Sequence, residues 1–342
     1  MSDPPPASRV APSYWGLWMH GIRPIGELVE LAVAAEQAGA STLLIADEGV
    51  DRDIYVVLAA IATATERITL VPGITNPFSR HPVATAAALA TLEELAPRRV
   101  VAGLGTGGSM VFGPMGFAPR RPFSALAESV DVIDALLAGH EVTHQGEFIA
   151  NRARLPWSPR RLPIGIAGRG PKVQQLAALR ADWVILAGKQ ISKVPELVAG
   201  VRARAAETRS AAPWIVWNPA AAWTESATCA TRPRFSYITI DMPAADRAAF
   251  GISDETILEL RHLLLTAGPE AAAHLIPDAV LEAHAIVGTR GAVVDRLRAS
   301  IGAARPEVLV FEAHEYSTDF IGDVADLAAA AGLSGATHRL LG

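Results

Sequence analysis

The chain contains a single cysteine, Cys229, among 342 residues. One thiol excludes an internal disulfide and any metal site built from several cysteines, and it suits a reducing cytoplasm, where we expect the protein to work. Charged residues are also scarce, at 19%, and the basic ones cluster no further than Arg-Arg pairs. Because nucleic acids and membrane surfaces are bound through clustered basic charge, we expect neither as a partner.

Long hydrophobic runs are absent as well. No apolar stretch reaches the roughly 18 residues that a membrane-spanning helix needs, so the sequence predicts no span. Residues 1–12 are rich in proline and lack an apolar core, which predicts a disordered lead-in rather than a signal peptide. Half of the chain is hydrophobic, and residues 13–342 are enough to form one large folded domain.

Short apolar runs alternate with Ala- and Leu-rich helical patterns along most of the chain. The apolar runs predict strands over 14–19, 42–46, 67–73, 98–105, 162–168, 182–188, 214–223 and 307–313. Helical periodicity predicts helices over 25–39, 52–65, 81–95, 123–139, 170–181, 192–207 and 290–301, with 290–301 and 307–313 as the last helix and strand. This alternation predicts an α/β fold, a (β/α)8 TIM barrel, with an open doubly wound sheet as the alternative. Residues 224–288 break the pattern and predict an irregular insertion, with helical pieces around 254–265 and 268–283.

The segment 140–144, His-Glu-Val-Thr-His, matches the H-E-x-x-H motif of zinc proteases, which works when a helix brings both imidazoles to one face. Here Gly139 ends the preceding helix, Val142 and Thr143 favour a strand, and Gly146 favours a turn. In a strand the two histidines lie about 13 Å apart, too far to share one zinc ion. The segment therefore predicts a surface β-hairpin near 140–150 and no metal site.

A glycine-rich loop follows the fourth predicted strand, in the sequence Gly-Leu-Gly-Thr-Gly-Gly at 103–108. Its spacing matches the dinucleotide fingerprint, in which the last glycine already lies inside a helix. The glycines and prolines of 113–122 argue against a helix here, so we expect none to open after the loop. The loop's N–H groups are instead expected to contact a ligand, with an ordinary tight turn as the alternative.

Two further connections carry polar side chains to strand ends, where barrel active sites lie. Residues 72–82, Pro-Gly-Ile-Thr-Asn-Pro-Phe-Ser-Arg-His-Pro, bring Arg80 and His81 there, and His81 either takes part in binding or catalysis or caps the next helix. Residues 167–172, Ala-Gly-Arg-Gly-Pro-Lys, place a cation beside a helix N-terminus, which favours an anion or phosphate site. Asp47 and Glu48 end the second strand, where they either perform acid–base work or hold the loop's N–H groups.

These motifs together resemble the luciferase-like superfamily of flavin- and deazaflavin-dependent barrels. The resemblance is carried by residues 34–108, 166–188 and 286–299, and above all by Asn-Pro-x-x-Arg-His-Pro at 76–82 with Gly-Leu-Gly-x-Gly at 103–107. The nearest branch is that of the coenzyme F420-dependent methylenetetrahydromethanopterin reductases. Residues 224–285 match weakly, in the region that varies most within this superfamily.

The resemblance implies a planar isoalloxazine or deazaflavin ring at the carboxyl ends of the strands. It implies a bulge with a non-prolyl cis peptide behind the ring, at Gly73, Ile74, Thr75 and Asn76. It also implies contacts to the cofactor's side chain and phosphate from two loops. The residues of these loops are Gly105, Thr106, Gly107, Gly108, Gly168, Arg169, Gly170, Pro171 and Lys172.

Two positions depart from the sugar- and alcohol-oxidising relatives, which carry a histidine and a glutamate where this chain has Glu48 and Gly108. The leading hypothesis is an oxidoreductase that uses F420 for hydride transfer to or from an unidentified small organic substrate. The alternative is a monooxygenase that uses reduced FMN, with a flavin or F420 reductase as a partner. A third hypothesis, from another class, is a ligand-binding barrel without catalysis. Members of the superfamily often form dimers, so a homodimer is expected.

Overall fold

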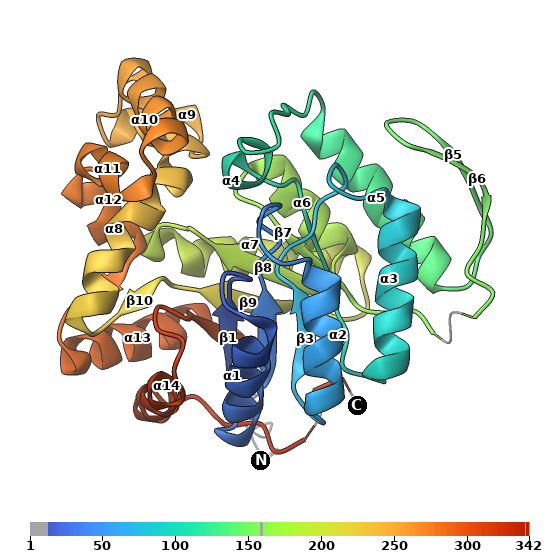
Figure 1. The fold of residues 1–342 in the computed structure, drawn as a ribbon, viewed down its shortest axis with the longest axis horizontal. Coiled ribbons are helices and arrows are strands. Elements are labelled where there is room, and N and C mark those ends of the chain that lie inside the picture. The colour runs from blue at the N-terminus through green and yellow to red at the C-terminus, as the bar shows by residue number, and fades with distance from the viewer. Residues whose placement is uncertain (1–12, 158–159, 339, 342) are drawn as a thin grey trace, which may run out of the picture.

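The barrel of this protein is built from parallel strands in the order expected for alternating strands and helices. The computed structural model describes residues 13–157, 160–338 and 340–341, so the predicted lead-in at 1–12 lies outside the described residues. Within the described part, eight strands form one sheet in the order β3-β2-β1-β12-β9-β8-β7-β4 (Figure 1). They are β1 (Tyr14–Met19), β2 (Thr42–Ile45), β3 (Thr69–Pro72), β4 (Ala102–Gly105), β7 (Ile164–Ala167), β8 (Trp183–Ala187), β9 (Trp214–Asn218) and β12 (Val308–Glu312).

The two edge strands, β3 and β4, meet and nearly close the sheet into a barrel. Leu70 N donates to Arg99 O at 2.6 Å, and Val101 N donates to Leu70 O at 3.1 Å. Further along, Thr75 N donates to Gly103 O at 3.1 Å. An open doubly wound sheet leaves its edges unpaired, so the TIM-barrel prediction is confirmed.

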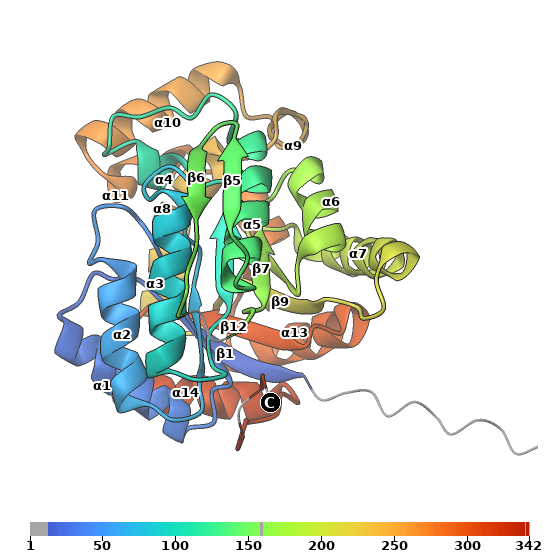
Figure 2. The ribbon, with the colours of Figure 1, turned by 90° about the vertical axis from the view of Figure 1, so that its right-hand side faces the viewer.

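Helices cover the outside of the barrel (Figures 1 and 2). They are α1 (Ile25–Gln37), α2 (Ile54–Ala64), α3 (Pro82–Leu95), α5 (Pro122–Leu137), α6 (Pro171–Arg180), α7 (Val194–Thr208, preceded by the short η1, Ile191–Lys193), α13 (Arg290–Ala304) and α14 (Thr318–Ala330). The last element predicted from the sequence was the strand at 307–313, so α14 was not expected. Ser317 caps this helix by accepting from Phe320 N. None of the helices that the structure describes has the length and apolar character to cross a membrane.

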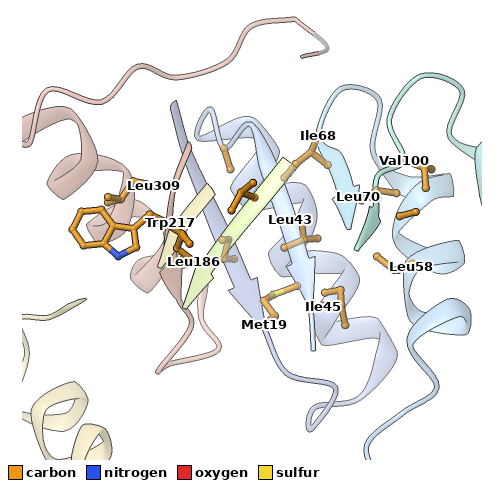
Figure 3. Packing of buried hydrophobic residues seen from close by; sticks show 14 of the residues in the cluster. Met19, Leu43, Ile45, Leu58, Ile68, Leu70, Val100, Leu186, Trp217 and Leu309 are labelled. Atoms are coloured by element: carbon orange, nitrogen blue, oxygen red, sulfur yellow. The ribbon is translucent and has the colours of Figure 1, made fainter. Parts of the chain in front are cut away.

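Side chains of each strand alternate between two apolar layers. Leu43 and Ile45 of β2 face outward and pack with helix residues such as Leu58, as Figure 3 shows. Leu44, between them, faces into the barrel and packs in a separate cluster with Val71. This alternation fixes the register of the strands, and with it the residues that emerge at their carboxyl ends.

The segment around residues 140–150 is a β-hairpin, as predicted. Strand β5 (Val142–Gln145) pairs antiparallel with β6 (Ile149–Ala153) in the connection that leads from α5 to β7 along the chain (Figure 2). His144 Nε2 lies 3.0 Å from Glu128 Oε2 of α5, and Glu147 N donates to the same oxygen at 2.7 Å. The H-E-x-x-H motif is therefore extended chain, and its second histidine is held by a carboxylate.

The insertion after β9 is helical along most of its length. The helical pieces predicted around 254–265 and 268–283 are confirmed, whereas the helices before residue 254 correct the expectation of an irregular segment. The helices of the insertion are α8 (Glu225–Ile240), α9 (Ala244–Ala249), α10 (Asp254–Thr266), α11 (Pro269–Ala272), η2 (Ala273–Leu275) and α12 (Asp278–His284). They share an apolar cluster of their own, which includes Phe235, Ile257 and Leu260. Packing on this cluster compensates for the weak helix propensity of α8, which contains Pro233 and, in its second half, Ile238, Thr239 and Ile240. The short strands β10 (Ala221–Ala222) and β11 (Ile286–Val287) pair in parallel at the base of the insertion.

Candidate active site

The carboxyl ends of the strands form a mouth to which several elements bring polar side chains. His20 follows β1, Asp47 and Glu48 follow β2, and Glu312 ends β12. Helix α8 crosses this end of the barrel, because its Arg234 contacts Glu312 and Asp241, just after the helix, contacts Arg169 beyond β7. The active sites of TIM barrels lie at this face.

Asp47 is fixed by the connection that follows β3. Thr75 Oγ1 donates to Asp47 Oδ2 at 2.8 Å, and Thr75 itself is buried. Burial raises the pKa of Asp47, although the hydrogen bond from Thr75 opposes the shift. The peptide bond Gly73–Ile74 is cis, as the resemblance implied.

The other polar side chains of this connection form contacts within it or with residues at the start of α2. Asn76 is buried, and its Oδ1 accepts from Phe78 N at 2.9 Å and Ser79 N at 3.0 Å. Arg80 pairs with Asp53 at 2.8 Å and lies over the ring of Tyr55. Asn76 Nδ2 also donates to Ser79 Oγ at 2.9 Å, so these contacts hold the wall of the mouth in shape.

His81 is the N-cap of α3. Its Nδ1 accepts from Val83 N at 3.2 Å, and its exposed ring packs against Phe148 of the hairpin loop. The capping alternative is thus the one that the structure bears out, and we assign no catalytic step to His81.

The glycine loop after β4 is packed against neighbouring side chains. Gly107 has φ +70°, and a Cβ there would overlap the ring of Phe112. A Cβ on Gly108 would lie 2.7 Å from Asp241 Oδ2. Thr106 Oγ1 donates only locally, to Gly107 O at 3.2 Å. Gly107 therefore lets Phe112 pack closely on the loop, and Gly108 lets Asp241 of the insertion approach the barrel.

One turn of helix, α4 (Ser109–Phe112), follows this loop, where we expected none. Ser109 N donates to Asp241 Oδ2 at 3.2 Å, so a carboxylate brought by the insertion holds the start of this turn. This turn was not expected because the contact that holds it comes from a distant part of the chain. The glycines and prolines of 113–122 limit the helix to a single turn.

The loop after β7 leads into a cavity of about 550 Å³ between α6, α7 and the insertion, to one side of the mouth. Arg169 reaches Asp241 at 3.2 Å, and Lys189 Nζ donates to Arg169 O at 2.9 Å. Burial, together with the charge of Arg169, lowers the pKa of Lys189 to about 8. Four cations line the cavity, Arg169, Lys189, Lys193 and Arg204, together with the two carboxylates of Glu196 and Asp246, and Asp246 pairs with Lys193.

This region suits an anionic group. Gly170 precedes α6 without a side-chain cap, Pro171 occupies the first turn, and a Cβ on Gly170 would meet nothing within 4 Å. N–H groups at a helix start with cations beside them attract carboxylates and phosphates. The cavity also has the size of a typical ligand site. Gly168 packs on Val173 instead, and Lys172 is exposed outside the cavity lining.

Glu48 also belongs to a second set of charged groups at the mouth, whose other members, His20, Glu312 and Arg234, were not expected from the sequence. His20 Nε2 lies 2.8 Å from Glu312 Oε1, and its Nδ1 lies 3.8 Å from Glu48 Oε1. Arg234 contacts the same oxygen of Glu312. The rule that located Asp47, polar residues just after a predicted strand, also locates His20 when it is applied to the first strand. It does not reach Glu312, which falls inside the predicted strand 307–313. Arg234 has no such signal, because it comes from the insertion.

The pKa values of the two glutamates of this set are shifted in opposite directions. Burial raises the pKa of Glu48 to about 7, with the charge of His20 opposing the shift. Burial also acts on Glu312, but its hydrogen bond from His20 and the charge of Arg234 hold its pKa down at about 2. Burial disfavours the charged imidazole of His20, yet Glu312 and Glu48 outweigh it and raise the pKa of His20.

No three His, Cys, Asp or Glu side chains within residues 13–157, 160–338 and 340–341 are arranged to hold a metal ion. His144, the second histidine of the H-E-x-x-H motif, is paired with Glu128 instead.

The luciferase-like monooxygenase family matches residues 8–305, which is most of the chain. The protein belongs to this family.

The proteins similar to this chain include F420-dependent enzymes, and solved structures with the same fold also include monooxygenases. A 5,10-methylenetetrahydromethanopterin reductase of Archaeoglobus fulgidus is 29% identical over 281 residues, 79% of this chain and 85% of that protein. An F420-dependent glucose-6-phosphate dehydrogenase of Nakamurella multipartita is 35% identical over 175 residues, 46% of this chain and 51% of that protein. The structure of the coenzyme F420-dependent tetrahydromethanopterin reductase of Methanopyrus kandleri has the same fold, with a TM-score of 0.78, 21% identity, and coverage of 94% of this chain and 99% of that one.

Proposed function

We propose that the protein is an oxidoreductase that binds coenzyme F420 and transfers a hydride to or from a small organic substrate at the barrel mouth. The observation that carries the proposal is the cavity lined by Arg169 and Lys189, which follow β7 and β8 at the same end of the barrel as the acid and base groups of the mouth. The relationship to F420-dependent reductases and dehydrogenases supports the same choice of cofactor. We further propose that it works in the cytoplasm as a homodimer.

The roles of the residues follow from where they lie. Arg169, Lys189 and the start of α6 would hold an anionic side chain of the cofactor. The wall at Gly73–Asn76 and the loop at Gly105–Gly108 would hold its ring, with Thr75 keeping Asp47 in place. When bound, F420 supplies two-electron hydride chemistry. The protein orients the substrate toward the ring, and α8 limits the access of water.

A monooxygenase that uses reduced FMN is the second candidate, favoured by the description of the family to which the chain belongs. It would need a flavin reductase as a partner, whereas the leading candidate would need an enzyme that recycles F420. A ligand-binding barrel without catalysis is the third.

Titration with each cofactor separates these candidates. We expect the fluorescence of F420 or of the purified protein to be quenched when the two bind. The Kd obtained from this change should be far below the Kd for FMN. Tighter binding of FMN would replace the leading proposal by the second, and binding of neither would leave the third.

Removal of a cation tests the location of the site. We expect Arg169→Ala to raise the Kd for F420 about tenfold or more, because a charge-assisted contact is worth roughly 1.5–3 kcal/mol. Arg180→Ala is the matched control, since Arg180 lies at the other end of α6 and pairs with Asp131. An unchanged Kd in Arg169→Ala, or an equal loss in both variants, would remove the cavity from the cofactor site.

A further inference from the structure

The C-terminal end of α8 covers the cavity at Arg169 and Lys189 and carries a carboxylate to its rim. Ile238 and Met242 line the cavity, and Ile238 also lies beside Gly188, which follows β8. Between them in the chain, Asp241 comes directly after the last turn of α8 and reaches Arg169. The end of α8 is therefore the part of the insertion that closes onto the barrel at the proposed anion site.

The guanidinium of Arg169 makes two contacts with this end of α8. Its Nη1 donates to Ile238 O at 3.2 Å, and its Nη2 donates to Asp241 Oδ2 at 3.2 Å. Ser109 N, in the loop after β4, donates to the same carboxylate oxygen at 3.2 Å. Asp241 thus supplies Arg169 with the negative charge that an anionic ligand of the cavity would otherwise supply.

The contacts of Arg169 with α8 are long for hydrogen bonds to a charged group. Charge-assisted N–H···O bonds usually measure about 2.7–2.9 Å, and arginine binds a carboxylate or phosphate best through two parallel bonds to one anion. Arg169 instead divides two nitrogens between a carbonyl and a carboxylate, each at 3.2 Å. The side chains of Arg169 and Asp241 are 27% and 24% exposed, so water screens their attraction. An anion that engages both nitrogens would therefore bind Arg169 more strongly than Asp241 does.

A second anion at Arg169 would release Asp241. It repels the carboxylate and draws the guanidinium away from it. Of the contacts that hold Asp241, the hydrogen bond from Ser109 N would remain, and its donor is neutral. About two turns earlier in α8, Arg234 contacts Glu312 and is not involved in this exchange. The helix would thus be freed at its C-terminal end and held further back.

The helix that follows, α9, is fastened to the barrel by separate contacts. Asp246 Oδ1 accepts from Lys193 Nζ at 3.1 Å and from Gln190 Nε2 at 3.3 Å. These contacts do not use Arg169, so release of Asp241 leaves α9 in place. The movement is therefore confined to the last turn of α8 and the connection at 241–243.

We infer that Asp241 blocks the anion site at Arg169 in the cofactor-free protein, and that the anionic side chain of the cofactor binds by displacing it, which loosens the end of α8 over the mouth. The inference rests on the proposed function, because it needs an anionic ligand at Arg169. Asp241 lowers the affinity for that ligand. Binding of the cofactor is thereby coupled to the freedom of the helix that covers the entrance for the substrate.

The first experiment needs no cofactor. Hydrogen–deuterium exchange over 236–242 should be faster in Asp241→Asn than in the wild type, because the variant loses the charge that Arg169 binds. Asp278→Asn is the matched control, since Asp278 pairs with Arg232 in an earlier turn of α8. It should leave exchange over 236–242 unchanged.

Gly108→Ala tests the same contact without removing a charge. A Cβ at Gly108 would lie 2.7 Å from Asp241 Oδ2 and should push the carboxylate off its position. The variant is measured without cofactor, because Gly108 lies in the loop proposed to hold the ring. Exchange over 236–242 should again be faster than in the wild type. Unchanged exchange in both Asp241→Asn and Gly108→Ala would show that Asp241 does not fasten α8 and would overturn the inference.

The second experiment follows displacement by a ligand. Saturating F420 should accelerate exchange over 236–242 in the wild type and change it little in Asp241→Asn, where the segment is already free. Inorganic pyrophosphate is an anionic probe that needs no F420, with sodium chloride at the same ionic strength as its control. We expect pyrophosphate, and not the salt, to accelerate exchange over 236–242.

The third measurement is the Kd for F420. Asp241→Asn should bind F420 about three- to tenfold more tightly than the wild type, because the pair with Arg169 no longer has to be broken. Asp278→Asn should bind F420 as the wild type does. Weaker binding by Asp241→Asn would mean that Asp241 supports the site instead of blocking it.

Failure of this inference and failure of the proposed function give different results. If F420 binds but leaves exchange over 236–242 unchanged or slower, the inference is wrong and the proposed function stands. If F420 does not bind while pyrophosphate accelerates the exchange, the proposed function fails and Asp241 blocks the site of another anion. If neither ligand accelerates the exchange, Asp241 is not displaced and the inference is overturned.

Discussion

Glu48 is a carboxyl group in surroundings that resist its ionisation, and this has a consequence for stability. Its pKa rises from an ordinary 4.5 to about 7, mainly through burial. Between those two pH values the unfolded chain has released the proton while the folded chain still holds it. Folding is therefore weakened as the pH rises through this window, and the cost is complete above it.

Glu48→Gln removes this cost and should stabilise the protein at pH 8 but not at pH 5. A shift of this size corresponds to at most about 3 kcal/mol, so we expect a gain on the order of 1–3 kcal/mol in the free energy of unfolding at pH 8. Urea denaturation at both pH values measures it. Equal stability of wild type and variant at pH 8 would mean that Glu48 ionises freely in the fold.

Among the elements, those with a local sequence pattern were predicted, except α14, and those stabilised by distant contacts were not. The strands and most of the covering helices lie within a few residues of their predicted positions, because buried parallel strands and amphipathic helices each leave a periodic pattern. Helix α8 was missed because Pro233 and its threonines disguise it, and its packing partners come from α10 to α12. Helix α14 had a clear signal in its Ser317 cap and its apolar residues Phe320, Ile321, Val324 and Leu327.

The residues of the candidate site show the same difference between local patterns and distant contacts. Asp47, Glu48 and Arg169 were found because polar residues after strands meet at one end of a barrel. Arg234 and Asp241 were not, because only the fold brings the insertion over that end. His81 caps α3 through its Nδ1, which was one of the two roles expected for it from the sequence.

Glu128 of α5 is one of the residues that attach the β5–β6 hairpin to the barrel, beside the Arg121–Glu147 ion pair and the packing of Phe148. Glu128→Ala removes the contacts to His144 and to Glu147 N, so amide exchange over 142–153 should accelerate, measured by hydrogen–deuterium exchange. Global stability should fall by less than about 1 kcal/mol, because the pair is partly exposed. Asp131→Ala, which removes an ion pair from the same helix, should leave the hairpin unchanged. Faster exchange in the barrel strands of Glu128→Ala would show that the hairpin supports the core.

At the scale of the whole molecule, closure of the barrel depends on the close approach of β3 and β4. A Cβ on Gly103 would overlap the Pro72 carbonyl oxygen and lie 2.9 Å from Val71 Cγ1. Gly103→Ala should therefore separate these strands and cost about 2 kcal/mol or more in the free energy of unfolding.

Gly322→Ala is the control, because a Cβ there meets nothing within 4 Å on an outer helix. It should leave stability unchanged or raise it slightly. Thermal unfolding of both variants provides the comparison, and equal midpoints would mean that β3 and β4 are not in tight contact.

The pairing of β10 with β11 has a further consequence. Because Ala221–Ala222 lies beside Ile286–Val287, the chain leaves the barrel and returns to it at adjacent points. The segment between them contains its own apolar cluster and contributes both Arg234 and Asp241 to the mouth. Evolution can therefore exchange this segment as a unit, changing which molecules enter the mouth while the barrel and its cofactor chemistry are inherited intact.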